Sequence, residues 1–123
     1  MKDSINIQVD QTENLATVIL SGEVDLYSSR EARKIILELA SRKVPIIIVD
    51  LSGVPYMDSS GLASMVEGLQ KVESYKGKFI LSGLQPMVNK VFELSRLNTV
   101  FTIYEDIDTA LNELDEKNEP VGG

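Results

Sequence analysis

The residues best suited to catalysis or modification lie in the stretch "VPYMDSSGL", from Val54 to Leu62. It places one carboxylate and two hydroxyls, those of Asp58, Ser59 and Ser60, between an apolar run and a segment with helical periodicity. Three roles fit these residue types: a helix cap, a catalytic nucleophile, or a serine that another protein phosphorylates. A phosphate at a helix start would accept hydrogen bonds from amide groups that the helix leaves unpaired.

The rest of the sequence speaks against catalysis by this stretch. The chain contains no histidine and no cysteine. The usual general base for a serine nucleophile is therefore missing, and thiolate catalysis and cysteine-type zinc sites are excluded. Neither a Gly-x-Ser-x-Gly elbow nor a glycine-rich phosphate loop occurs. A serine–lysine pairing stays open on sequence grounds, but we expect no enzyme activity, no cofactor and no metal.

Neighbouring residues extend the candidate site. Gly61 lies in the first helical turn, where glycine costs about 1 kcal/mol relative to alanine, so we expect another backbone or a ligand to approach it closely. In the loop before the helix, we expect Tyr56 to face outward as part of a partner contact and Met57 to face inward. Three aspartates could gather as a magnesium site, but their spacing matches no metal motif and favours turn and cap roles: Asp25, Asp50 and Asp58.

Periodicity predicts the elements that position this stretch. Apolar alternation on either side of the turn cluster "DQTEN" predicts a β-hairpin over residues 5–9 and 15–22. The apolar run 44–51, with Pro45 at its start, predicts a strand buried on both faces. Further strands are predicted over 78–83 and 100–104, and helices over 28–43, 59 to about 74, 85–98 and 106–114.

The resulting order, β-β-α-β-α-β-α-β-α, predicts an α/β fold in which one domain covers residues 1–114. We expect a mixed, mostly parallel sheet of four to five strands with about four helices. Ser28 and Glu31 are predicted to form a capping box for the first helix, and Gly77 a left-handed cap for the second. The polar segment 115–123 is predicted to be a disordered tail. In such folds, sites gather just past the carboxyl ends of the strands.

Charge narrows the choice of partner. The chain has 19 Asp and Glu against 12 Lys and Arg, a net charge of -7. This balance disfavours binding to nucleic acid or to an anionic membrane surface. It suits a basic protein partner, although an ordinary solvated acidic surface is the favoured explanation. No signal-peptide core or membrane-spanning run is evident in the sequence, so we expect a cytoplasmic protein, either a monomer or a weak dimer.

Longer stretches resemble a known family. "SGEVDLYSS", "IIIVDLSGVPYMDSSGLASMVEGL" and "GKFILSGLQPMVNKVFELSRLNTVFTIYEDIDTAL" are similar to the STAS domain of bacterial anti-sigma-factor antagonists, from about Ile5 to Leu114. The resemblance implies a partner-switching regulator. The dephosphorylated antagonist would bind an anti-sigma factor that is also a serine kinase, and sigma factor would be released. A PP2C-type phosphatase would reverse the phosphorylation.

The resemblance also implies roles for individual residues. The phosphorylated residue would be Ser59, directly after the motif aspartate, whereas physical reasoning alone does not choose it over Ser60. Asp58 and Asp25 would lie beside the hydroxyl and shape the contact surface, and Ser60 and Gly61 would complete the motif loop. STAS-like domains also serve as non-switching scaffolds, such as a partner of a lipid-transport ABC ATPase or a stressosome component, and this alternative stays open.

Overall fold

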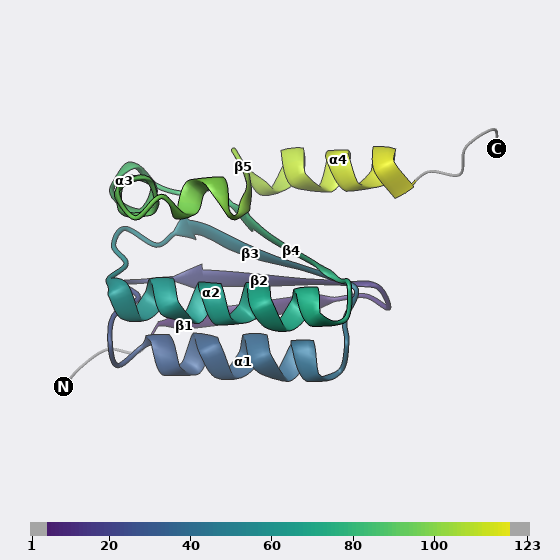
Figure 1. The fold of residues 1–123 in the computed structure, drawn as a ribbon, viewed down its shortest axis with the longest axis horizontal. Coiled ribbons are helices and arrows are strands. Elements are labelled where there is room, and N and C mark those ends of the chain that lie inside the picture. Colours follow the sequence, from purple (N-terminus) through teal and green to yellow (C-terminus); the bar gives the residue numbers. More distant parts are fainter. Residues whose placement is uncertain (1–4, 119–123) are drawn as a thin grey trace.

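A β-hairpin opens the fold in the computed structural model, which describes residues 5–118 (Figure 1). Its strands, β1 (Asn6–Gln11) and β2 (Leu15–Ser21), pair in antiparallel fashion. Three strands then join in parallel, giving the sheet order β1-β2-β3-β4-β5. They are β3 (Ile46–Gly53), β4 (Lys78–Ser82) and β5 (Thr102–Tyr104). The predicted mixed, mostly parallel sheet is confirmed.

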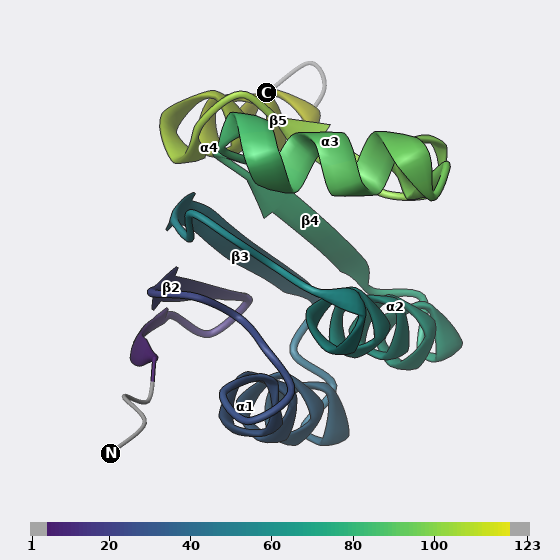
Figure 2. The same ribbon diagram turned by 90° about the vertical axis from the view of Figure 1, so that its left-hand side faces the viewer.

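Helices connect the parallel strands in the predicted order. They are α1 (Ser29–Ser41), α2 (Ser59–Ser74), α3 (Pro86–Leu94) and α4 (Ile107–Asn118). Figure 2 shows α1 and α2 lying together on one side of the sheet, whereas α3 and α4 lie towards the β5 edge. Because β2 to β5 run in the same direction, their carboxyl ends meet at one rim of the sheet, and the Asp58 loop follows β3 at this rim.

Two apolar cores hold the layers together. The larger core joins one sheet face to α1, α2 and α3, and the smaller core joins the other face to α4. β3 contributes to both cores, which confirms the strand predicted to be buried on both faces. Burial of each large aliphatic side chain contributes about 1.5–3 kcal/mol. The larger core includes Val18, Ile36, Ile47, Met65, Leu81 and Phe92, and the smaller one includes Ile48, Ile80, Ala110 and Leu114.

The second helix ends differently from the prediction. Lys76, with φ of 65°, adopts the left-handed conformation that was expected of Gly77. The Gly77 amide donates to Val72 O (2.9 Å). A Cβ atom at Gly77 would lie 2.9 Å from Pro45 O. The glycine is therefore needed for close packing against the start of β3, and the assignment of the cap was wrong by one residue.

The last two helices also differ in length from the predictions. α3 ends at Leu94 because Arg96 takes a left-handed conformation (φ 63°), and a 3-10 turn follows over Leu97–Thr99. The helix predicted to reach residue 98 is therefore shorter. α4 continues to Asn118 and so includes the first four residues of the predicted disordered tail, which was expected to begin at Asp115. The rest of that predicted tail, 119–123, lies outside the described residues.

Tyr75 ties the end of α2 to the loop before β3, and its removal gives a pH-dependent prediction. Its hydroxyl donates to Val44 O (2.7 Å), and burial raises the pKa of this phenol above its ordinary value of 10.0. The stability from the half-buried, protonated phenol is present below pH 10 and lost as the pH rises through the raised pKa. Tyr75→Phe should cost about 0.5–1.5 kcal/mol near neutral pH. Urea unfolding at pH 7 and pH 11 should show a smaller alkaline loss in the variant, and an equal loss would contradict this role.

Candidate functional site

The candidate site is the rim where two distant segments run side by side. The Gly22 amide donates to Gly53 O (2.9 Å), and the Val24 amide donates to Tyr56 O (3.0 Å). The Asp58 amide donates in return to Val24 O (3.1 Å). Val24 and Met57 thus form a parallel bridge that continues β2 and β3 beyond the sheet. As a result, Asp25 and Asp58 directly follow the bridge on its two strands.

Asp58 is the N-cap of α2, as one of the predicted roles required. Its backbone is extended, and its Oδ1 accepts hydrogen bonds from the amides of Ser60 (2.9 Å) and Gly61 (3.3 Å). This carboxylate therefore already uses two of the amides that were expected to be free for a phosphate. A phosphate on the adjacent serine would instead lie beside a negative charge that the helix start already holds in place.

Accessibility distinguishes the two serines of the motif. Ser59, the first residue of α2, is exposed, whereas Ser60 is half-buried. The backbone carbonyl of Ser60 also accepts a hydrogen bond from Ser64 Oγ (3.1 Å). Ser59 is therefore the more accessible of the two residues to another protein. This geometric distinction could not be made from the sequence.

Gly61 is buried, and the reason for its small size lies within the molecule. A Cβ atom at this position would lie 2.4 Å from Met57 Cγ and 2.9 Å from Val24 Cγ1. The expected close approach therefore involves the protein's own side chains, and nothing at Gly61 points to a ligand. Met57 is 1% exposed and Tyr56 is 42% exposed, which confirms the orientations predicted for both. Gly61 thus allows the Val24–Met57 bridge to lie directly on α2.

Asp25 caps the turn that leads into α1. Its Oδ1 accepts hydrogen bonds from the amides of Tyr27 (2.9 Å) and Ser28 (3.0 Å). The Asp25 amide donates in return to Ser28 Oγ (2.9 Å), so these two residues form the reciprocal pair. The predicted capping box of Ser28 and Glu31 was therefore wrong by three residues. An additional turn precedes α1, and the Asp25 carboxylate in this turn accepts a hydrogen bond from the Ser28 hydroxyl.

Apolar side chains project from the same rim. Leu26 is 54% exposed and Tyr27 is 65% exposed in the Asp25 turn, which belongs to the segment that the Val24–Met57 bridge joins to the Tyr56 loop. We call Leu26, Tyr27 and Tyr56 the apolar rim. Sequence reasoning singled out only Tyr56, although the apolar pair directly after Asp25 in a turn was an available signal. Exposed aromatic and aliphatic side chains in a group are typical of surfaces that contact other proteins.

The third aspartate considered for a metal site has a separate role. Asp50 is buried at the end of β3 and accepts hydrogen bonds from the Ser52 amide (3.1 Å) and Ser52 Oγ (3.2 Å). Within residues 5–118, no group of three or more Asp and Glu side chains is placed to hold a metal ion. None of the helices described is both long enough and apolar enough to cross a membrane.

The cap geometry predicts distinct effects for two substitutions of Asp58. Asp58→Ala leaves the Ser60 and Gly61 amides without their acceptor, and should lower the free energy of unfolding by about 0.5–2 kcal/mol. Asp58→Asn retains a cap oxygen and should lose much less. Thermal unfolding of the two variants at equal concentration checks this difference. Equal destabilisation by both substitutions would show that the carboxylate charge, and not the cap bond, stabilises α2.

Comparisons with known proteins agree with this fold. The sequence model of the STAS domain family matches residues 6–110, and the chain belongs to this family. The anti-sigma-B factor antagonist of Bacillus subtilis (strain 168) is 32% identical over 100 residues, which cover 81% of this chain and 91% of the relative.

Solved structures of other proteins show the same fold. An anti-sigma factor antagonist from Mycobacterium paratuberculosis has a TM-score of 0.81 and 25% identity, covering 89% of this chain and 93% of that one. The Bacillus cell fate determinant SpoIIAA, in its phosphorylated form, has a TM-score of 0.72 at 23% identity, covering 89% and 99%. This last likeness concerns the fold alone.

Proposed function

We propose that the chain is an anti-sigma-factor antagonist that binds a serine-kinase anti-sigma factor, and that phosphorylation of Ser59 abolishes this binding. The main support for the proposal is that Ser59 is exposed directly after its capping aspartate. Asp25 and the side chains of the apolar rim lie at the same end of the sheet. Membership of the STAS family and the similarity to anti-sigma-B factor antagonists support it.

Electrostatics explains why phosphorylation of Ser59 would weaken binding and not strengthen it. A phosphoryl group adds a charge of about -1.5 to -2 at neutral pH. At Ser59 it would stand beside Asp58, whose carboxylate already accepts the Ser60 and Gly61 amides. Those amides cannot fully neutralise both groups, so the excess charge and bulk face the partner. Because Ser59 is exposed, the core stays intact and only the contact surface changes.

Each residue of the rim has a proposed part in partner binding. Tyr56 contacts the partner directly through its exposed ring. Asp25 and Asp58 order the two turns that frame Ser59, and Ser60 completes the start of the helix. Gly61 acts from below the surface, since its lack of a side chain allows Met57 and Val24 to hold the rim together.

The same proposal defines the partners and the setting. The kinase would supply ATP and the catalytic residues, and the STAS domain would be its substrate, not an enzyme in its own right. A PP2C-type phosphatase would restore the hydroxyl of Ser59. The acidic net charge of -7 suits a basic partner surface. The cytoplasm is the proposed location, and a monomer or weak dimer the proposed state.

A capture experiment separates this function from a scaffold role. The wild-type chain, Ser59→Ala and Ser59→Asp are immobilised and exposed to lysate of the source bacterium, and bound proteins are identified by mass spectrometry. We expect an anti-sigma-type serine kinase on the wild type and on Ser59→Ala, and its absence from Ser59→Asp. Equal capture of an ABC ATPase or of stressosome proteins by all three baits would contradict the switch and indicate a scaffold function.

A further inference from the structure

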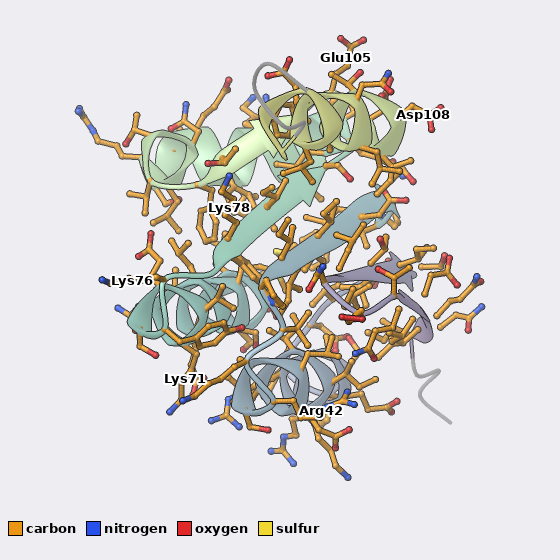
Figure 3. All side chains as sticks on the ribbon, turned by 90° about the vertical axis from the view of Figure 1, so that its right-hand side faces the viewer. Arg42, Lys71, Lys76, Lys78, Glu105 and Asp108 are labelled. Atoms are coloured by element: carbon orange, nitrogen blue, oxygen red, sulfur yellow. The ribbon has the colours of Figure 1, made fainter. Side chains whose placement is uncertain are left out.

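Basic side chains gather at the end of the molecule opposite Ser59. α2 runs from Ser59 at the rim to Ser74 at the far end, where α1 also ends. Figure 3 looks onto this end and shows Arg42, Lys71 and Lys76 near the outline around α1 and α2, Lys78 nearer the centre beside β4, and the acids Glu105 and Asp108 farther away near α4. In a chain with a net charge of -7, this surface is unusual. We call it the basic pole; its members, all exposed, are Arg42, Lys43, Lys71, Lys76 and Lys78.

A groove lies between the ends of the two helices within the basic pole. It has a volume of about 350 Å³. Ala40 is buried and Leu37 is half-buried, so the α1 side offers an apolar floor. One lysine comes from each helix end, Lys43 after α1 and Lys71 in the last turns of α2. The other lining residues are Ser41, Ser74 and Tyr75.

Hydrogen bonding in the groove leaves the lysines as its principal donors. The hydroxyls of Ser41 and Ser74 donate within their own helices, to Glu38 O (2.6 Å) and Lys71 O (2.6 Å). The Tyr75 hydroxyl donates to Val44 O (2.7 Å). The pKa of the Glu67 carboxylate is lowered mainly by the hydrogen bond from Arg33 and to a smaller extent by the charge of Lys71, one turn further along α2. A ligand in the groove therefore meets apolar surface flanked by two ammonium groups.

Helix electrostatics explains only part of this arrangement. Cations near a helix C-terminus interact favourably with its dipole, which accounts for Lys71 and Arg42. Lys43 and Lys76, however, have φ of 57° and 65°, where glycine fits without strain. The helix dipoles also do not explain why a groove lies between the two helix ends. The chain thus keeps lysines at two positions where the backbone favours a residue without a side chain.

We propose that this groove is a second docking site, which takes an acidic protein segment with an apolar side chain on Leu37 and Ala40 and carboxylates facing Lys43 and Lys71. Charge complementarity selects carboxylates, and the floor selects an aliphatic side chain between them. The acids of the adjoining helix turns, Glu38 and Glu73, do not line the groove. Because the site lies at the far end of α2, an occupant leaves Ser59 accessible to a kinase. The proposal does not depend on what binds at Ser59.

Other anionic occupants fit the surroundings less well. A membrane or a nucleic-acid backbone presents a large anionic surface, which the net charge of -7 repels. A second copy of the chain would have to place an acidic region against the basic pole. Such a contact between unlike surfaces generates open chains unless its rotation closes a ring. A short protein segment avoids both difficulties.

The test uses the full chain, labelled with 15N, and a synthetic peptide in which one leucine is flanked by two glutamates on each side. Amide chemical shifts follow the titration. We expect saturable changes confined to the groove, at Lys43, Lys71 and Ser74. Affinity should fall about threefold to tenfold for the double variant Lys43→Gln/Lys71→Gln, as expected for two exposed charge pairs. The control Lys34→Gln/Lys90→Gln removes two exposed lysines elsewhere and should bind as the wild type does.

Two further probes decide the chemistry. A peptide with glutamine in place of glutamate should bind as weakly as the double variant binds the acidic peptide. Vesicles containing phosphatidylserine should not compete for the groove. Absence of saturable shifts, unchanged affinity in the double variant, equal loss in the control variant, or displacement of the peptide by the vesicles would each overturn the proposal. Thermal unfolding of both double variants confirms that they are folded.

Discussion

Ser59→Asp is expected to weaken binding of the anti-sigma serine kinase at least about a hundredfold. The new carboxylate would stand beside Asp58 at the start of α2, on the exposed rim proposed to face the partner. Juxtaposed like charges at an interface cost several kcal/mol, and about 3 kcal/mol corresponds to a hundredfold in affinity. Biolayer interferometry with the purified kinase measures this loss directly.

The stability of the same variant separates a switch from simple damage. Ser59 is exposed at a helix start, where an added negative charge interacts favourably with the helix dipole. The midpoint of thermal unfolding should therefore stay close to that of the wild type. Ser74→Asp, at the exposed far end of the same helix, should bind the kinase normally. A large loss of thermal stability in Ser59→Asp, or equal weakening by Ser74→Asp, would contradict the proposed switch.

Gly61→Val is expected to be the most destabilising single change at the site. Even the first added carbon would lie 2.4 Å from Met57 Cγ and 2.9 Å from Val24 Cγ1, so these two buried side chains must shift. Overpacking of this kind costs about 1–3 kcal/mol. We expect about 2 kcal/mol, which for this chain length lowers the unfolding temperature by about 6–10 °C. Calorimetry of the purified variant checks the value.

A neighbouring position provides the control for Gly61. Ala63 is exposed on the same helix, so Ala63→Val adds the same branched side chain where space is available. Its cost should be limited to the lower helix propensity of valine, about 0.5 kcal/mol. Gly61→Val should also weaken kinase binding, because Met57 and Val24 position Tyr56 and Asp25. Equal stability of the two valine variants would show that the rim adapts to the added volume.

The arrangement of elements could be predicted from the sequence because its hydrophobic periods are unambiguous. The continuous apolar run of β3 indicated a strand covered on both faces, and the two cores confirm this. Pro86 at the start of α3 and the aspartate before α2 marked two helix starts correctly. These signals are local, since each depends on residues within one or two turns of the element that they define.

Features of the site that depend on contacts between distant segments could not be predicted in this way. Besides its sequence neighbour Met57, Gly61 packs against Val24, which reaches it only through the Val24–Met57 bridge. The shift of the capping box from Ser28 to Asp25 arises from an additional turn that periodicity does not reveal. Similarly, the exposure that separates Ser59 from Ser60 depends on how α2 packs against the sheet.

Mass spectrometry of the chain after incubation with its anti-sigma kinase and ATP shows directly whether Ser59 is the switch. We expect one added phosphate per chain, located on Ser59 by peptide fragmentation. We also expect no incorporation in Ser59→Ala, although that variant still binds the kinase. Phosphate found on Ser60, or labelling that persists in Ser59→Ala, would contradict the assignment of Ser59 as the switch.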